Sequence, residues 1–105
     1  MPWYDYVAYF FAGAFLANAI PHFVSGVIGR TFPSPFAKPP GKGKSSPLVN
    51  VLWGTLNFVI GYFLVCRVGE FHIRDLTDVV VCGAGGLVMA IMLAQHFGEV
   101  YAGQA

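Results

Sequence analysis

Charged residues are scarce in this chain of 105 residues, of which only 10% are Asp, Glu, Lys or Arg. Six basic residues nearly balance five acidic ones, so the sequence lacks the strong positive charge that would favour nucleic acid as a partner. No acidic residue lies between positions 6 and 69. A chain with so few charges cannot present the charged surface of an ordinary soluble domain.

Recognisable catalytic motifs are also lacking. The sequence contains no paired carboxylates, no nucleophile beside a base and no phosphate-binding loop. Residues 79–86 look like a strand that enters a dinucleotide-binding turn, but Val88 occupies the last glycine position and no acidic residue follows at the required spacing. Small residues on one helix face explain the same glycines. We therefore expect no enzymatic activity, no nucleotide and no metal site.

Hydrophobic residues make up 56% of the chain and form three long runs, at residues 6–28, 48–68 and 79–97. Each run is close to the roughly 20 residues that an α-helix needs to cross a bilayer. The sequence therefore predicts an all-α integral membrane protein, a single domain over residues 1–105 with helices at about 6–28, 48–68 and 76–97. No Lys or Arg precedes the first run, which is typical of a retained span rather than a cleaved signal peptide.

The segment at residues 29–47 interrupts the apolar pattern. Five prolines exclude a long helix there, so we expect an extended loop on the membrane surface. These are Pro33, Pro35, Pro39, Pro40 and Pro47. The loop is basic, while the loop at 69–78 has Arg74 with three acids. The positive-inside rule predicts that the first loop and the C-terminus are cytoplasmic and the N-terminus external, in a bacterial inner membrane.

The basic residues of the first loop are candidate contacts for membrane lipids. They are Arg30, Lys38, Lys42 and Lys44. A cation near the inner surface contributes about 1 kcal/mol toward anionic lipid. The alternative interpretation is a docking site for a protein partner.

The first two runs carry matching stripes of small and polar residues. The stripes are Ala14, Asn18, His22 and Gly26 in the first run and Asn50, Gly54, Asn57 and Gly61 in the second. In an antiparallel hairpin these positions pair at equal depth, as 14 with 61, 18 with 57, 22 with 54 and 26 with 50. We expect the Asn18 and Asn57 amides to meet and His22 to pass over Gly54 and reach Asn50. One such hydrogen bond contributes about 0.6 to 2 kcal/mol, so its main effect is to set the register.

Four further sets of residues carry structural predictions. Pro21 removes a backbone donor, so the first helix should kink there. The third run has small residues at every fourth position, Cys82, Gly86, Ala90 and Ala94, which predicts a face that docks on the hairpin or on a neighbouring protomer. Asp75 and Asp78 are expected to cap the start of the third helix. Cys66 and Cys82 lie at the two ends of the second loop, and two free thiols are expected rather than a bridge.

The leading functional hypothesis is association, with the chain acting as a homo-oligomer or as an accessory subunit of a larger membrane complex. A small oligomeric transporter or channel is the first alternative, with His22, Asn18 and Asn57 along its pathway. The second is a haem or chlorophyll carrier, because His22 and His96 should fall at similar depth on parallel helices. The small-residue interface predicted in all three cases consists of Ala14, Gly26, Gly54, Gly61, Gly86 and Ala90.

Overall fold

Three long helices make up most of the molecule. The structure, a computed structural model, describes residues 2–103. The helices are α1 (Trp3–Val27), α2 (Pro47–Phe63), which continues into a π-helical turn η1 (Leu64–Val68), and α3 (Leu76–Ala102). The helical segments Trp3–Val27, Pro47–Val68 and Leu76–Ala102 are each long and apolar enough to cross a membrane. The prediction of three apolar helices is thus confirmed, although α1 begins earlier and α3 ends later than expected.

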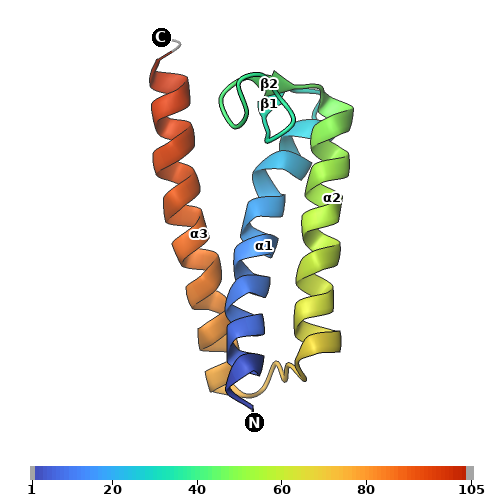
Figure 1. The fold of residues 1–105 in the computed structure, drawn as a ribbon, viewed down its shortest axis with the longest axis vertical. Coiled ribbons are helices and arrows are strands. Elements are labelled where there is room, and N and C mark those ends of the chain that lie inside the picture. The colour runs from blue at the N-terminus through green and yellow to red at the C-terminus, as the bar shows by residue number, and fades with distance from the viewer. Residues whose placement is uncertain (1, 104–105) are drawn as a thin grey trace.

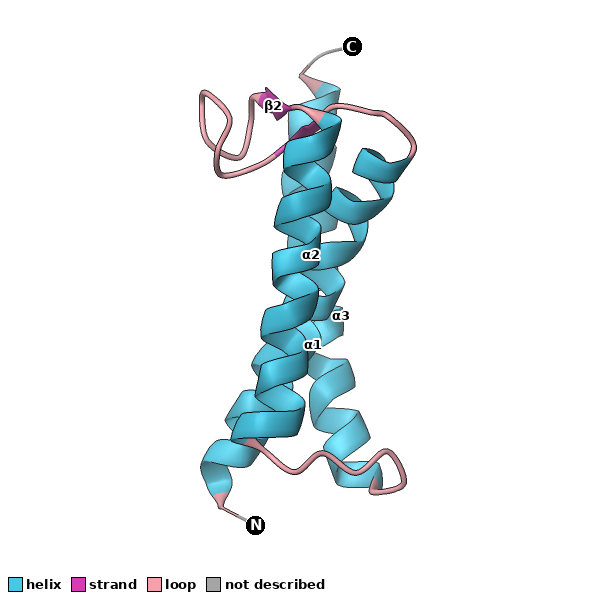
Figure 2. Cartoon of the chain, turned by 90° about the vertical axis from the view of Figure 1, so that its right-hand side faces the viewer, coloured by secondary structure: helices cyan, strands magenta, loops and turns pink. Residues whose placement is uncertain are grey.

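The central helix is α1, which packs between α2 and α3 (Figure 1). The buried share of the apolar span falls from 39% in α1 to 22% in Pro47–Val68 and 11% in α3. The two loops lie at opposite ends of a molecule 47 Å long, so α1 and α2 run antiparallel and α1 and α3 run parallel (Figure 2). Toward its C-terminal end α3 diverges from the other two helices (Figure 1).

Side-chain caps mark the starts of α2 and α3. Ser46 accepts a hydrogen bond from the Val49 backbone N–H at 3.2 Å, and Pro47 follows at the first helical position, where its missing donor costs nothing. The Asp75 carboxylate accepts from the Thr77 N–H at 3.0 Å, which confirms its predicted capping role. Asp78 was expected to cap as well, but it accepts instead from the backbone of the preceding loop.

The first loop is more ordered than its composition predicts. Two short strands, β1 (Phe32–Pro33) and β2 (Lys44–Ser45), pair antiparallel within it, with Phe32 opposite Ser45. The Ser34 and Ser45 hydroxyls share a buried hydrogen bond of 2.5 Å. Strands of two residues leave no alternating pattern in the sequence, which is why the prediction of a plain extended loop missed them.

Pro21 lies inside α1, which continues without interruption from Trp3 to Val27. Its ring removes the donor that would otherwise bond to the Ala17 carbonyl. The kink expected at this position stays a prediction.

Candidate functional site

A polar seam runs between α1 and α2, and its middle is a pair of amides. The Asn18 Nδ2 group donates to Asn57 Oδ1 at 2.9 Å, so the two side chains meet as the equal-depth pairing predicts. The Asn57 Nδ2 group in turn donates to the Trp53 backbone carbonyl at 2.8 Å. Asn57 has no exposed surface. Its amide is therefore bonded at both ends, as a buried polar group must be.

The second part of the seam joins His22 to Asn50, both of which are buried. The Asn50 Nδ2 group donates to the backbone carbonyls of Phe32 at 3.0 Å and Ser46 at 3.1 Å. That orientation leaves Asn50 Oδ1 as an acceptor for His22 Nδ1, which lies 2.8 Å away. Because an amide oxygen only accepts, His22 must carry a proton on Nδ1. Asn50 therefore links α1, α2 and the first strand of the loop.

Glycines along the seam allow the two helices to approach closely, but not in all the expected pairs. A Cβ atom added to Gly54 would lie 2.8 Å from the Phe23 backbone nitrogen, so the nearest residue to Gly54 on α1 is Phe23, the chain neighbour of His22. At Gly26 an added Cβ would lie 2.6 Å from the Pro47 carbonyl oxygen, and at Gly61 it would lie 2.7 Å from Leu16 Cδ2. Residue spacing along the two helices predicts the depth at which each pair lies. It does not predict the direction in which each side chain points.

The contact between α1 and α3 is also formed by glycines. A Cβ added to Gly13 would overlap the Cys82 carbonyl oxygen, and one added to Gly85 would overlap the Phe10 carbonyl oxygen. At Gly86, by contrast, an added Cβ would stand 3.4 Å from the nearest atom, the Gly13 carbonyl oxygen, which is a normal contact. The closest approach on α3 is therefore at Gly85, one residue before the predicted Gly86.

Only the first half of the predicted small-residue stripe of α3 lies at the contact between α1 and α3. Ala90 and Ala94 are exposed, so these two residues do not dock on the hairpin, and docking on a neighbouring protomer stays a prediction. Four residues turn an α-helix by about 400°, so each step of four moves the stripe about 40° around the axis. From Cys82 to Ala90 the drift is about 80°, enough to move a side chain from the α1 contact to the outer surface. On α1 Ala14 remains buried.

A cavity of about 320 Å³ lies where α3 separates from the hairpin. Its walls are almost entirely apolar, with the Asn18 and Asn57 side chains at one side. The lining residues are Phe10, Phe11, Ala14, Phe15, Asn18, Trp53, Asn57, Gly85, Val88, Met89 and Met92. The Trp53 indole N–H is buried without a hydrogen-bond partner among the described residues.

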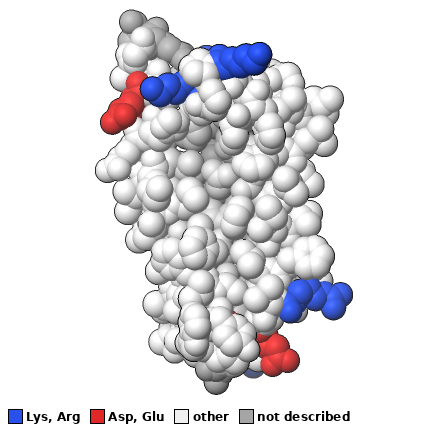
Figure 3. Space-filling view, in the orientation of Figure 1, with Lys and Arg blue, Asp and Glu red and all other residues white. Residues whose placement is uncertain are grey.

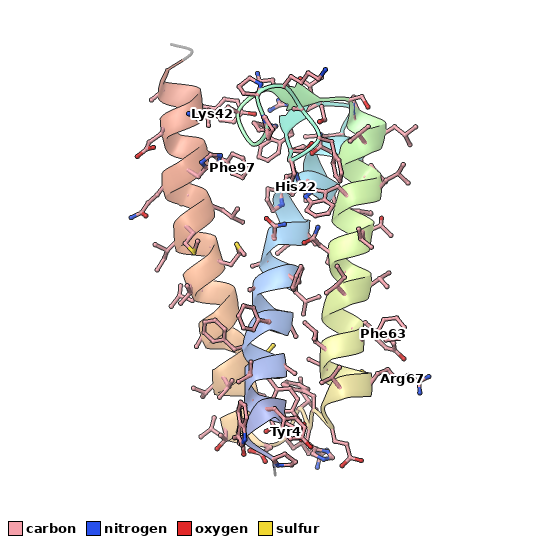
Figure 4. All side chains as sticks on the ribbon, viewed as in Figure 1. Tyr4, His22, Lys42, Phe63, Arg67 and Phe97 are labelled. Atoms are coloured by element: carbon pink, nitrogen blue, oxygen red, sulfur yellow. The ribbon has the colours of Figure 1, made fainter. Side chains whose placement is uncertain are left out.

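The two histidines proposed as a ligand pair are not brought together. The Phe97 ring, whose centre is 6.1 Å from that of His22, occupies the side of α3 that faces α1 (Figure 4). His96 turns toward the loop, where its Nε2–H donates to the Gly41 carbonyl at 2.6 Å. Both imidazoles therefore have protein partners. Cys66 and Cys82 are free thiols, as expected.

A buried acidic cluster lies at the opposite end of the bundle, and the sequence reasoning missed it. Asp5 is 7% exposed, while Tyr9 and Asp78 have no exposed surface. Asp78 Oδ2 accepts from the His72 N–H at 3.0 Å, but its Oδ1 and the Tyr9 hydroxyl have no partner among the described residues. Tyr9 packs edge-on against Phe71, with ring centres 5.3 Å apart. The only signal in the sequence was the spacing of four that places Asp5 and Tyr9 on one helix face.

The charged side chains gather at the two ends of the molecule, and the face between them is uncharged (Figure 3). The predicted lipid-contact residues Arg30, Lys38, Lys42 and Lys44 are all exposed at the loop end. Arg67 points away from the bundle at the other end (Figure 4).

No family model, curated protein or solved structure matches this chain. Conclusions about its function therefore rest on its own residues and their geometry.

Proposed function

We propose that the chain is an integral membrane protein that acts by association, either as a homo-oligomer or as an accessory subunit of a larger membrane complex. The observation that carries this proposal is a small-residue face on α3. It consists of Gly83, Ala90, Ala94 and Gly98, all exposed. An added Cβ at Gly83 or Gly98 would meet no atom within 4 Å. At 100° per residue the four positions fall within about 80° of the helix circumference.

Small residues support association because apolar side chains gain little by meeting one another inside lipid. Helices in a bilayer associate where small residues let their backbones approach closely. The contacts of Gly13 with Cys82 and of Gly85 with Phe10 in this chain are examples, since neither glycine position tolerates a Cβ. The small-residue face of α3 offers the same kind of surface, and only 11% of the α3 span is buried within the chain. A helix from a second copy or from another subunit fits this surface.

The polar seam has a structural role in this proposal. His22, Asn50 and Asn57 are buried and bonded to one another or to backbone carbonyls. Satisfied side chains of this kind set the register of a hairpin, whereas a transport pathway needs groups that can exchange partners with a solute. The transporter alternative, with His22, Asn18 and Asn57 along the pathway, therefore has less support. The haem alternative has less support as well, because Phe97 rather than His96 contacts His22.

The proposed orientation places the basic loop in the cytoplasm and the N-terminus outside, in a bacterial inner membrane. It is supported by the separation of charge along the molecule (Figure 3). One end carries four basic loop residues, and the other carries four of the five acids together with Arg67 and Arg74. Positive charge on short loops is retained on the cytoplasmic side.

The experiment that tests association is native mass spectrometry of the full chain released from native-lipid nanodiscs. We expect an assembly larger than the monomer, and the double substitution Ala90→Leu with Ala94→Leu should reduce it by about tenfold or more because leucines hold helix backbones apart. Ala84→Leu is the matched control, since Ala84 is also exposed but lies about 80° around the helix from Ala94. A wild-type protein found only as a monomer, with no second subunit, would contradict the proposal.

A further inference from the structure

At the loop end of the bundle, an open pocket of about 400 Å³ is formed by three distant parts of the chain. Gly29, Arg30 and Thr31 come from the end of α1, Lys44 from β2, and Tyr101 from the last turn of α3. We call this the headgroup pocket. Its lining is about half polar, unlike the apolar cavity between the helices.

One of the two cations of the headgroup pocket lies over the aromatic ring of the same pocket. The Lys44 ammonium nitrogen lies 5.1 Å from the centre of the Tyr101 ring, a cation–π contact, and Arg30 lines the same pocket. Among the described residues, the acid near this end of the chain is Glu99, which lines a neighbouring pocket with Lys42 and His96. The described residues therefore give the lining of the headgroup pocket two positive charges and no carboxylate.

A guanidinium, an ammonium and two hydroxyl groups around one opening are the groups that bind a phosphate. Arg offers parallel N–H donors to phosphate oxygens, Lys adds a point charge, and the Thr31 and Tyr101 hydroxyls can donate as well. Basic pockets between helices at the cytoplasmic surface are a known way of holding anionic lipid headgroups. We propose that the headgroup pocket binds the phosphate of an anionic phospholipid and that the other loop lysines do not form this site.

The position of the pocket favours a lipid phosphate over a free one. It lies where the apolar parts of α1 and α3 end, beside exposed Val27 (57%) and Ile28 (59%). Acyl chains of a bound lipid would run down this apolar surface while the phosphate stays in the pocket. The lipid would thereby strengthen the link between the loop and the end of α3. These two parts already meet where Lys44 lies over Tyr101, where Phe32 packs against Phe97 and Tyr101, and where His96 bonds to Gly41.

The test compares two double substitutions that remove the same charge from the same loop. The full chain, in a neutral detergent, is titrated with phosphatidylglycerol, and bound lipid is counted by native mass spectrometry. Arg30→Gln with Lys44→Gln should weaken binding by about tenfold or more, since each of the two cations contributes a factor of about five. Lys38→Gln with Lys42→Gln should leave it within about twofold. Equal losses in both variants would overturn the proposal, because they would show diffuse attraction by net charge.

Two further measurements separate the remaining explanations. Arg30→Lys with Lys44→Arg keeps both charges and should retain binding, which shows that a loss in the glutamine variant is not caused by misfolding; loss of binding in this variant too would overturn the proposal. Inorganic phosphate is then titrated alone. Binding of inorganic phosphate as tight as that of the lipid, and equally dependent on Arg30 and Lys44, would overturn the lipid assignment in favour of a free phosphate site. The results of the lipid and phosphate titrations do not depend on the oligomeric state. Failure of the lipid proposal is therefore distinguishable from failure of the association proposal.

Discussion

Asn50→Leu is the substitution whose effect follows most directly from the structure, because Asn50 connects three parts of the chain. Its side chain accepts from His22 Nδ1 at 2.8 Å and donates to the carbonyls of Phe32 and Ser46 at 3.0 and 3.1 Å. Leucine has a similar volume but makes none of these bonds. The buried His22 N–H then has no acceptor, which costs about 1 to 3 kcal/mol, and each carbonyl loses a bond worth about 0.5 to 1.5 kcal/mol.

The expected loss for Asn50→Leu is therefore about 2 to 6 kcal/mol of unfolding free energy. Asn57→Leu is the informative comparison, because it removes one interhelical bond, from Asn18, and a bond to a carbonyl that already belongs to the helix. We expect that variant to lose only about 1 kcal/mol. Thr55→Leu, at an exposed position of the same helix, is the matched control and should be nearly neutral.

The assay is reversible unfolding of the purified protein in mixed detergent micelles, followed by the fluorescence of Trp53 in a background that carries Trp3→Phe. His22→Phe combined with Asn50→Leu should recover about 1 to 2 kcal/mol of the loss, because it removes the unpaired N–H as well. If Asn50→Leu lowers the free energy of unfolding no more than Asn57→Leu does, Asn50 does not hold the loop to the helices and the prediction is wrong.

The remaining predictions concern packing and orientation. Gly85→Ala should destabilise the fold by about 1 to 3 kcal/mol in the same unfolding assay, because its Cβ would overlap the Phe10 carbonyl, whereas Gly83→Ala, with nothing within 4 Å, should be neutral or slightly stabilising. In a cysteine-free background, a cysteine at Lys42 should be protected from a membrane-impermeant maleimide applied to intact cells, and a cysteine at Arg74 should react. The opposite pattern would reverse the proposed orientation.

The position of each residue along its helix axis was predictable from the sequence, because an α-helix rises by a constant 1.5 Å per residue. That is why the stripes of the first two helices correctly brought Asn18 to Asn57 and His22 to Asn50. The number of apolar helices followed from the lengths of the hydrophobic runs in the same way. Local signals also sufficed for the cap at Asp75, because the side chain and the backbone donor it binds are two residues apart.

Only the tertiary structure decided which way each side chain points and what surrounds it. Facing directions depend on the tilt and rotation of whole helices, which are set by packing rather than by spacing. Gly54 therefore opposes Phe23, Gly85 rather than Gly86 forms the close contact, and Ala90 lies outside. The pairing of β1 with β2, the burial of Asp78 and the meeting of Lys44 with Tyr101 likewise join residues that are far apart in the sequence or in different elements.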